Sequence, residues 1–266
     1  MALGMSTALD FDAELAARVE AVYATPDVAA TRVAVFRALG LRGGEHALDV
    51  GCGPGYLTRE LAVAVGSAGV VTGVDLSEPM LALAARRCAG LGQVRLVQGD
   101  AGRLALEAGS VDAACGLQVY CYIRELEAAL LELRRVLKVG GRAVILDSDF
   151  SGVVWESRNR ERMRAMLRAF DAHAAWPDLP RVLPATLRRA GLELERCEAV
   201  PFVTLQYHAN TYVYGVARFI HQFVIKNGGV AVEEANAWLA ELDTLEAERS
   251  FFYSMNRFMF VVRRAS

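Results

Sequence analysis

The sequence predicts a single α/β protein, built on a mostly parallel sheet that helices cover on both faces. Short apolar or β-branched runs alternate with longer helical patterns over the first 150 residues, as expected for consecutive βα units. A glycine-rich stretch, ALDVGCGPGY at 47–56, directly follows the first of these runs, where a strand would turn into its helix. The chain has 266 residues, 54% of them hydrophobic, which is enough for one large core.

Five strands and three helices are expected before residue 150. The strands are HALDV (46–50), VVTGVD (70–75), VRLVQG (94–99), VDAACG (111–116) and RAVILDS (142–148). The helices are TRELAVAV (58–65), SEPMLALAARRCAGLG (77–92) and ELEAALLELRRVLKVGG (125–141). Ser77 is a suitable N-cap for the second helix, which has Pro79 in its first turn, and paired glycines end the third.

The remaining segments predict further helices and two late strands. One or two helices are expected in the first forty residues, and an arginine-rich helical segment at about 155–175. A proline-bounded connector, WPDLPRVLP at 176–184, leads into a short helix that ends at Gly191. Late strands are expected at 193–207 and 251–264. The helical pattern between them, at 212–248, is too long for a simple hairpin.

Composition narrows the classes of function. A formal net charge of −2 without a basic block argues against a nucleic-acid binder that uses a broad basic field. No apolar run approaches the ~18 residues of a membrane span, and a cytoplasmic location is expected. The five cysteines are scattered and form no CxxC pair, so buried free thiols are expected rather than disulfides or zinc. Arginine far outnumbers lysine, which suggests a GC-rich bacterial genome.

The glycine-rich stretch predicts a ligand site at the carboxyl ends of the strands. Backbone N–H groups and a helix N-terminus meet there. Gly51, Gly53 and Gly55 have the spacing GxGxG, which departs from the GxGxxG of dinucleotide-binding loops. Asp75 ends the second strand, where a carboxylate can accept hydrogen bonds from both hydroxyls of a ribose. A dinucleotide or another nucleoside-containing cofactor would use it in the same way.

Five stretches in order then resemble a known family. LDVGCGPG, VTGVDLSEPML, VQGDAGRL, VDAACGLQVYCYI and LRRVLKVGGRAVILDSD, between about His46 and Asp149, look like the successive motifs of class I S-adenosylmethionine-dependent methyltransferases. The similarity is greatest to the small-molecule branch that includes ubiquinone and menaquinone C-methyltransferases. This resemblance implies a Rossmann-like sheet of seven strands with a helical cap, and S-adenosylmethionine as the cofactor.

The resemblance also implies roles for individual residues. Asp49, Gly51, Gly53 and Gly55 would surround the methionine moiety, and Asp75 would hold the ribose. Leu76 and Met80 would pack near the adenine, Asp100 would accept from its amino group with Ala101 beside it, and Leu117 and Gln118 would line the methyl-transfer face. The implied domains are an N-terminal helical lid (1–42), a cofactor-binding core (43–150), and the rest of the sheet with helical cap insertions for the acceptor (151–266).

The acceptor side is predicted from side-chain chemistry. Aromatic residues suit a flat or hydrophobic acceptor, and the candidates for binding it are Tyr23, Tyr120, Tyr122 and Trp155. His208 and His221 are candidates for a general base, or are structural histidines. Asp147 and Asp149 could supply two metal ligands, but without further paired ligands no metal is expected.

The sequence thus predicts an enzyme of secondary metabolism that methylates O or C of a small, aromatic or polyketide-like metabolite. The expected partner is this small-molecule acceptor, with no nucleic acid and no membrane span, and a homodimer is compatible with the sequence. An NAD-dependent oxidoreductase is the first alternative, disfavoured by the GxGxG spacing and the lack of a downstream Tyr-xxx-Lys pair. A non-catalytic cofactor-binding protein of the same fold is the second.

Overall fold

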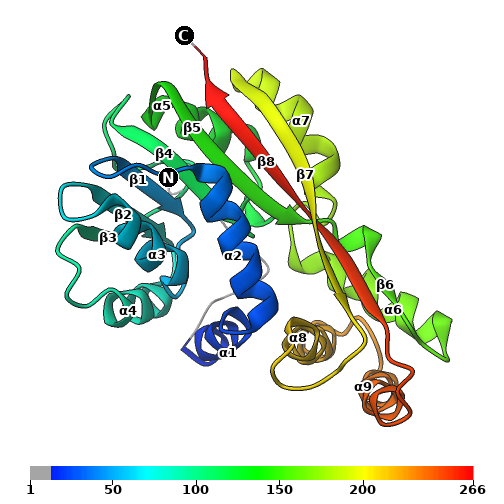
Figure 1. The fold of residues 1–266 in the computed structure, drawn as a ribbon. Coiled ribbons are helices and arrows are strands. Elements are labelled where there is room, and N and C mark those ends of the chain that lie inside the picture. Colours follow the sequence, from blue (N-terminus) through cyan, green and yellow to red (C-terminus); the bar gives the residue numbers. More distant parts are fainter. Residues whose placement is uncertain (1–12, 266) are drawn as a thin grey trace.

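A computed structural model describes residues 13–265. Its sheet has the strand order β3-β2-β1-β4-β5-β8-β6 (Figure 1). β5 pairs with one edge of β8, and β7 pairs with the opposite edge of β8. The described strands are β1 His46–Val50, β2 Val70–Asp75, β3 Val94–Gln98, β4 Val111–Leu117, β5 Leu137–Ser148, β6 Val154–Trp155, β7 Leu192–Thr204 and β8 Tyr253–Arg264. The first five are parallel, whereas β8 runs antiparallel to both β5 and β7. The predicted α/β class is therefore confirmed.

The expected strands are present, and one short strand was not expected. β6 has only two residues, which pair with Tyr253 and Ser254 at the start of β8, so the sheet has eight strands and not seven. The helical segment expected from about residue 155 consequently begins later, as α6 at Arg160. Two residues are too few to give a periodic pattern in the sequence.

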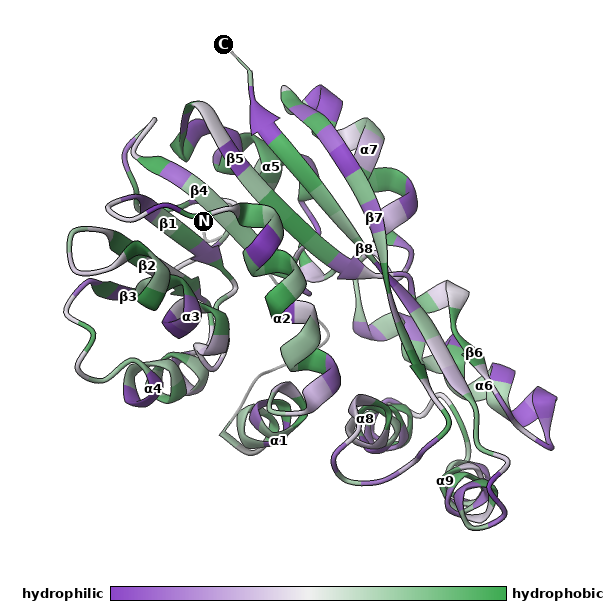
Figure 2. Ribbon diagram, in the orientation of Figure 1, coloured by the Kyte–Doolittle hydropathy of each residue, from purple (hydrophilic) through white to green (hydrophobic). Residues whose placement is uncertain are grey.

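Helices lie on both faces of the sheet. The described α-helices are α1 Ala13–Tyr23, α2 Pro26–Leu39, α3 Tyr56–Val65, α4 Glu78–Arg87, α5 Leu126–Val136, α6 Arg160–Phe170, α7 Leu179–Arg189, α8 Tyr212–Lys226 and α9 Val232–Ala247. α2 and α3 bury apolar side chains in one cluster with β1 and β4, and α5 and α7 do so in another on the opposite face. Figure 2 shows the central strands hydrophobic along most of their length, as burial on both faces requires.

A third apolar cluster joins the helical cap to the far ends of β7 and β8. It contains Trp155, Met163, Phe170 and Trp238 and is centred on α6, α8 and α9. α1 packs on α4 and α8, whereas α2 packs mainly on the sheet. Residues 1–12 of the segment predicted as an N-terminal lid lie outside the described residues, and in the rest of it both α1 and α2 contact the cap helix α8. No helix in the described part of the chain is long and apolar enough to cross a membrane.

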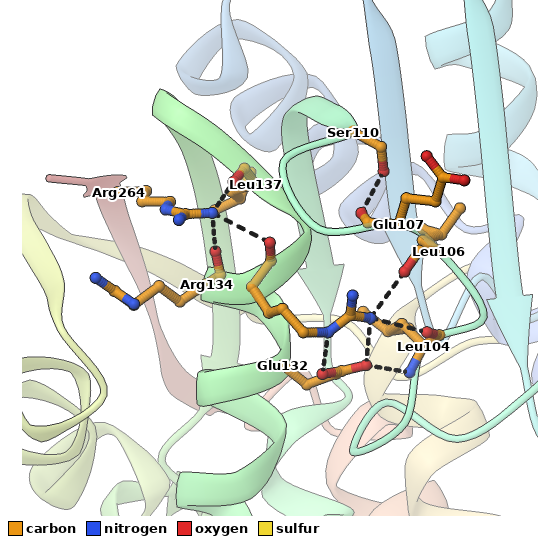
Figure 3. Close-up of polar contacts among 9 residues, drawn as sticks. Leu104, Leu106, Glu107, Ser110, Glu132, Arg134, Leu137 and Arg264 are labelled. Atoms are coloured by element: carbon orange, nitrogen blue, oxygen red, sulfur yellow. Dashed lines mark hydrogen bonds and ion pairs between the residues drawn. The ribbon is translucent and has the colours of Figure 1, made fainter. Parts of the chain in front are cut away.

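A polar network fixes the end of the sheet opposite the glycine loop (Figure 3). Arg135 contacts both carboxylate oxygens of Glu132, each at 2.7 Å, and donates to the carbonyls of Leu104 and Leu106. Glu132 also accepts the Leu104 N–H at 2.8 Å. The end of α5 is thereby attached to the loop that leads into β4.

Candidate functional site

The three loop glycines share a left-handed backbone but face different neighbours. Their φ angles are +63° at Gly51, +51° at Gly53 and +79° at Gly55. A Cβ on Gly51 would lie 2.4 Å from Val119 Cγ2, and one on Gly55 would lie 2.8 Å from Ala84 Cα. A Cβ on Gly53 would meet only the Tyr23 ring, at 3.8 Å. Gly51 and Gly55 thus permit close packing within the protein, while Gly53 leaves space above the loop.

Asp75 at the end of β2 holds this loop in place. Its Oδ2 accepts the Gly53 N–H at 2.8 Å, and its Oδ1 accepts the Ser77 N–H at 2.9 Å. Ser77 in turn caps α4, as predicted, by accepting the Met80 N–H at 3.3 Å. Burial raises the pKa of Asp75, which its backbone hydrogen bonds partly oppose. Each carboxylate oxygen keeps a lone pair for a ligand.

A single cavity of about 1030 Å³ extends from this loop toward the cap. The residues predicted to bind the cofactor or acceptor that line it are Gly51, Gly53, Asp75, Leu76, Met80, Asp100, Ala101, Gln118, Tyr23 and Tyr122. Asp100 accepts the Gly102 N–H at 2.7 Å, which fixes its turn. Gln118 adopts a positive φ of 59°, and its side-chain oxygen accepts from Ser148 Oγ at 2.5 Å. The cavity therefore joins the predicted cofactor residues to part of the predicted acceptor side.

Three residues that the resemblance places beside the cofactor lie outside the cavity lining: Asp49, Gly55 and Leu117. Asp49 is buried behind the loop, where Thr58 Oγ1 donates to it at 2.6 Å. Burial raises the pKa of Asp49 to about 7. Asp49 and Gly55 support the loop from within the core.

Aromatic side chains form the other end of the cavity. Tyr122, Phe150, Phe170 and Phe219 line it together with His173. The His173 ring stacks on Phe170 with centroids 3.8 Å apart, and its Nδ1 lies 2.6 Å from the Phe170 carbonyl oxygen, which assigns the proton to Nδ1. Its Nε2 is buried without a hydrogen-bond partner in the described part of the chain. Burial lowers the pKa of His173 to about 4, so the ring is neutral at pH 7.

Four predicted acceptor or catalytic residues are not brought to this cavity. Tyr120 is 1% exposed and packs against Gly116, where a Cβ would lie 2.6 Å from its ring. Trp155 packs against Trp238 and Tyr253 in the cap cluster, with centroids 5.4 and 4.8 Å away.

The two predicted catalytic histidines are likewise directed elsewhere. His208 Nε2 lies 3.3 Å from the side-chain oxygen of Gln206. His221 Nε2 lies 2.8 Å from that of Asn236 on α9. His221 lies on α8 and does not line the cavity, although several other residues of this helix do. The structure therefore does not support the roles predicted for His208 and His221.

His173 and Arg257 both line the cavity, although neither was predicted from the sequence. Arg257 had a detectable signal. It interrupts an alternating buried pattern in β8, in which Tyr253, Met255 and Met259 are the other members. His173 had no comparable signal, because it lies in a short 3-10 turn after α6.

The acidic residues at the end of β5 face the protein interior or an arginine. Asp147 is fully buried, accepts the Cys121 N–H at 3.4 Å, and has its pKa raised by burial to about 7. Asp149 forms an ion pair with Arg181 at 3.0 Å. Within residues 13–265, no group of three or more His, Cys, Asp or Glu side chains is arranged to hold a metal ion.

Known proteins are similar to the segment that carries the glycine loop. Residues 48–145 match a family described as a methyltransferase domain. A 37.1 kDa protein in transposon TN4556 of Streptomyces fradiae is 40% identical over 146 residues, or 54% of this chain and 42% of that protein. Demethylmenaquinone methyltransferase of Staphylococcus aureus (strain MRSA252) is 42% identical over 120 residues, or 44% of this chain and 48% of the relative. The chain thus spans less than half the length of these curated relatives.

Solved structures match over most of the chain and show the fold. The 4+2 cyclase SpnF is 24% identical, with a TM-score of 0.59 over 90% of this chain and 81% of its own. YcgJ from Bacillus subtilis is 17% identical, with a TM-score of 0.62 over 90% and 99%. Geranyl diphosphate C-methyltransferase from Streptomyces coelicolor A3(2) is 18% identical, with a TM-score of 0.56 over 89% and 79%.

The βα order, the loop glycines, Asp75 and the family match all agree on one assignment. Residues 48–145 match a methyltransferase domain, and this part of the chain is similar to class I S-adenosylmethionine-dependent methyltransferases, among them a demethylmenaquinone methyltransferase.

Proposed function

We propose that this protein transfers a methyl group from S-adenosylmethionine to a small, largely apolar acceptor, by O- or C-methylation. The observation that carries the proposal is the continuous cavity, which has the glycine loop and Asp75 at one end and aromatic walls at the other. Methyl transfer needs donor and acceptor aligned in one space from which water is excluded.

The cofactor end fits S-adenosylmethionine. Gly53 leaves room above the loop, and we assign the carboxylates of Asp75 and Asp100, which both line the cavity, to the ribose and the adenine amino group. Met80 and Leu76 supply apolar surface for the base, with Ala101 beside it. When bound, the cofactor supplies an electrophilic methyl group on a sulfonium. Gln118, held by Ser148, lies at the boundary between this end and the aromatic end.

At the aromatic end, we assign to His173 the polar contact with the acceptor. From the sequence, His208 or His221 was predicted to make this contact, as a general base. A neutral imidazole with a free Nε2 accepts a hydrogen bond from an acceptor hydroxyl, and so orients the oxygen. Because its pKa is about 4, it is a weak proton acceptor. Alignment by His173 and by stacking on the aromatic walls is therefore the main contribution of the protein.

Titration with S-adenosylhomocysteine tests the cofactor end. Asp75→Asn keeps the shape of the side chain but removes its charge, and we expect affinity to fall by roughly 30-fold, or about 2 kcal/mol. Asp112→Asn is the matched control, because Asp112 also accepts a backbone N–H, from His46, but at the opposite end of the sheet. Equal affinities of the two variants would contradict the assignment of Asp75.

Turnover tests the reaction itself. Wild-type protein, S-adenosylmethionine and a panel of phenols, quinols and β-dicarbonyl compounds should yield S-adenosylhomocysteine together with a product heavier by one methylene. For an acceptor found in this way, His173→Phe should lower kcat/KM at least tenfold, whereas His221→Phe should not. An acceptor that is converted without gaining mass would support a second candidate, a non-methylating enzyme, since a structure with this fold is described as a cyclase.

A further inference from the structure

Arg257 is a buried cation in the middle of β8 that lines the cavity. It is 1% exposed and pairs in the sheet with Ser148 of β5 and Val200 of β7. Its Nε and Nη1 atoms have no hydrogen-bond partner among residues 13–265. A guanidinium has five N–H donors, and burying its charge unpaired costs free energy. The side chain therefore lacks a partner that its position demands.

Two aromatic rings lie against Arg257, and its side chain also forms a hydrogen bond with Tyr212, but Nε and Nη1 remain without a partner. The guanidinium carbon lies 4.1 Å from the centroid of the Phe202 ring and 5.1 Å from that of Tyr212. Such cation–π contacts involve the faces of the aromatic rings. The N–H groups of a guanidinium point outward in its own plane, and they form hydrogen bonds there. These contacts leave Nε–H and Nη1–H available.

No carboxylate of the described chain pairs with Arg257. Among residues 13–265, none of the ion pairs within 4 Å includes it. Asp147 on β5 is near enough for Arg257 to lower its pKa, but burial is the larger influence and raises that pKa to about 7. No ion pair among residues 13–265 therefore neutralises the charge of Arg257, which lines the cavity.

Arg257 lies beside the cavity wall that faces the cofactor loop. Burial raises the pKa values of Tyr23 and Tyr212, and in both cases Arg257 is the strongest opposing influence. Tyr23 is also the side chain above Gly53. Arg257, Tyr23 and Tyr212 therefore lie near one another in the lining of the cavity.

We propose that Arg257 binds an anionic oxygen group, a carboxylate or an ionised enol, on the otherwise apolar molecule that occupies this cavity. The inference rests on the proposed function only in taking that molecule to be the methyl acceptor. A planar guanidinium binds two oxygens of a carboxylate side by side, and it favours the ionised form of an enol over the neutral one. Arg257 is then a specificity-determining residue that selects acidic acceptors over neutral ones of the same shape.

Calorimetric titration with a matched pair of probes tests this proposal. 2-Naphthoate and 2-naphthamide have nearly the same shape, but only the first carries a charge. We expect wild-type protein to bind 2-naphthoate at least tenfold more tightly than 2-naphthamide. Arg257→Met should weaken 2-naphthoate binding at least tenfold and change 2-naphthamide binding less than threefold.

Arg218→Met is the control, because Arg218 also lines the cavity but is already satisfied. It lies over the Tyr214 ring, 3.3 Å from the centroid, and donates to Tyr207 Oη at 2.9 Å. Its replacement should change the ratio of the two probe affinities less than threefold. Arg257→Lys, which keeps the charge, should retain most of the preference for 2-naphthoate.

Failure to bind 2-naphthoate, or equal wild-type affinities for the two probes, overturns the proposal, and this result does not depend on whether any variant folds. An equal loss of affinity for both probes in Arg257→Met also overturns the proposal, because the arginine would then affect only the shape of the cavity. Titration with S-adenosylhomocysteine separates the two proposals. If wild-type protein fails to bind it yet discriminates between the probes, the proposed function fails and the anion site stands.

Discussion

Gly53 has the same backbone requirement as other left-handed glycines, but a different surrounding space. Gly40, at the end of α2, has φ +55°, close to the +51° of Gly53, and a Cβ there would meet nothing within 4 Å. The two positions therefore share the strain that a β-branched side chain would introduce. They differ in that only Gly53 lines the cavity.

Gly53→Val should lower the affinity for S-adenosylhomocysteine at least tenfold, because the new methyl groups occupy ligand space above the loop. Gly40→Val should lose comparable stability and bind normally. Calorimetric titration and thermal unfolding of both variants measure the two effects separately. Normal binding by a folded Gly53→Val would mean that the loop serves the fold alone.

Asp147 links stability to pH. Its pKa is raised from 3.8 to about 7 by burial, so the folded state holds a proton that the unfolded state releases above about pH 4. The contribution of this group to stability is therefore complete below pH 4 and is lost as pH rises toward 7. Asp147→Asn mimics the protonated form, so it avoids this loss. The difference in free energy of unfolding between the variant and wild type should rise by about 2 kcal/mol from pH 5 to pH 8. Urea unfolding at both values checks this, and an equal effect at pH 5 and pH 8 would contradict it.

Residues with local sequence signals were predictable, and those defined by distant contacts were not. Gly53 and Asp75 follow strands whose ends can be recognised, so their positions at the site were predicted. Asp49 and Gly55 have the same local signal, but their neighbours Thr58 and Ala84 direct them into the core. His208, in the loop before α8, and His221, on α8, do not line the cavity, because the side that a cap segment turns to a cavity depends on tertiary packing.

At the scale of elements, α5 is attached to the loop before β4 by residues that do not themselves line the cavity (Figure 3). Glu132 is central to it, since its carboxylate binds Arg135 and also accepts the Leu104 N–H. The ion pair lowers the pKa of Glu132, so its charged form contributes to stability at neutral pH.

Glu132→Gln should lower the free energy of unfolding by about 1–2 kcal/mol and leave the affinity for S-adenosylhomocysteine unchanged. Glu127→Gln is the matched control on the same helix. Glu127 pairs with Arg189 at 2.8 Å, but both side chains are about half exposed, and we expect no more than ~0.5 kcal/mol. Chemical denaturation measures both, and equal losses would show that the buried network adds nothing.

The first four strands were predicted to within one residue because each has its own apolar pattern and punctuation, whereas residues 137–141, predicted as the end of a helix, belong to β5. α4 begins one residue after its predicted cap, Ser77. β6 and the arrangement of α6, α8 and α9 were not predicted, because they form by packing on one another around Trp155 and Trp238. Such contacts between segments far apart in the chain leave no local pattern.

At the scale of the whole molecule, ligand binding and stability are coupled through the cavity that both halves share. S-adenosylhomocysteine at 100 times its Kd should add about 2.7 kcal/mol to the free energy of unfolding. The melting temperature should then rise by roughly 5–10 °C, given about 2–4 °C for each kcal/mol in a chain of this size. NADH at the same concentration should cause no rise. A rise with NADH alone would favour the oxidoreductase alternative.

The cap helices α8 and α9 lie, in chain order, between two residues that pair with each other on neighbouring strands. Thr204 ends β7 and pairs with Tyr253, which begins β8. The ends of the insertion are thus only about 5 Å apart, the spacing of neighbouring strands. An evolutionary exchange of residues 205–252 for a segment of another length would leave the sheet register and the glycine loop unchanged. Arg257 lies outside that segment, so descendants of this protein could acquire new acceptor shapes while inheriting the same preference for a negative charge.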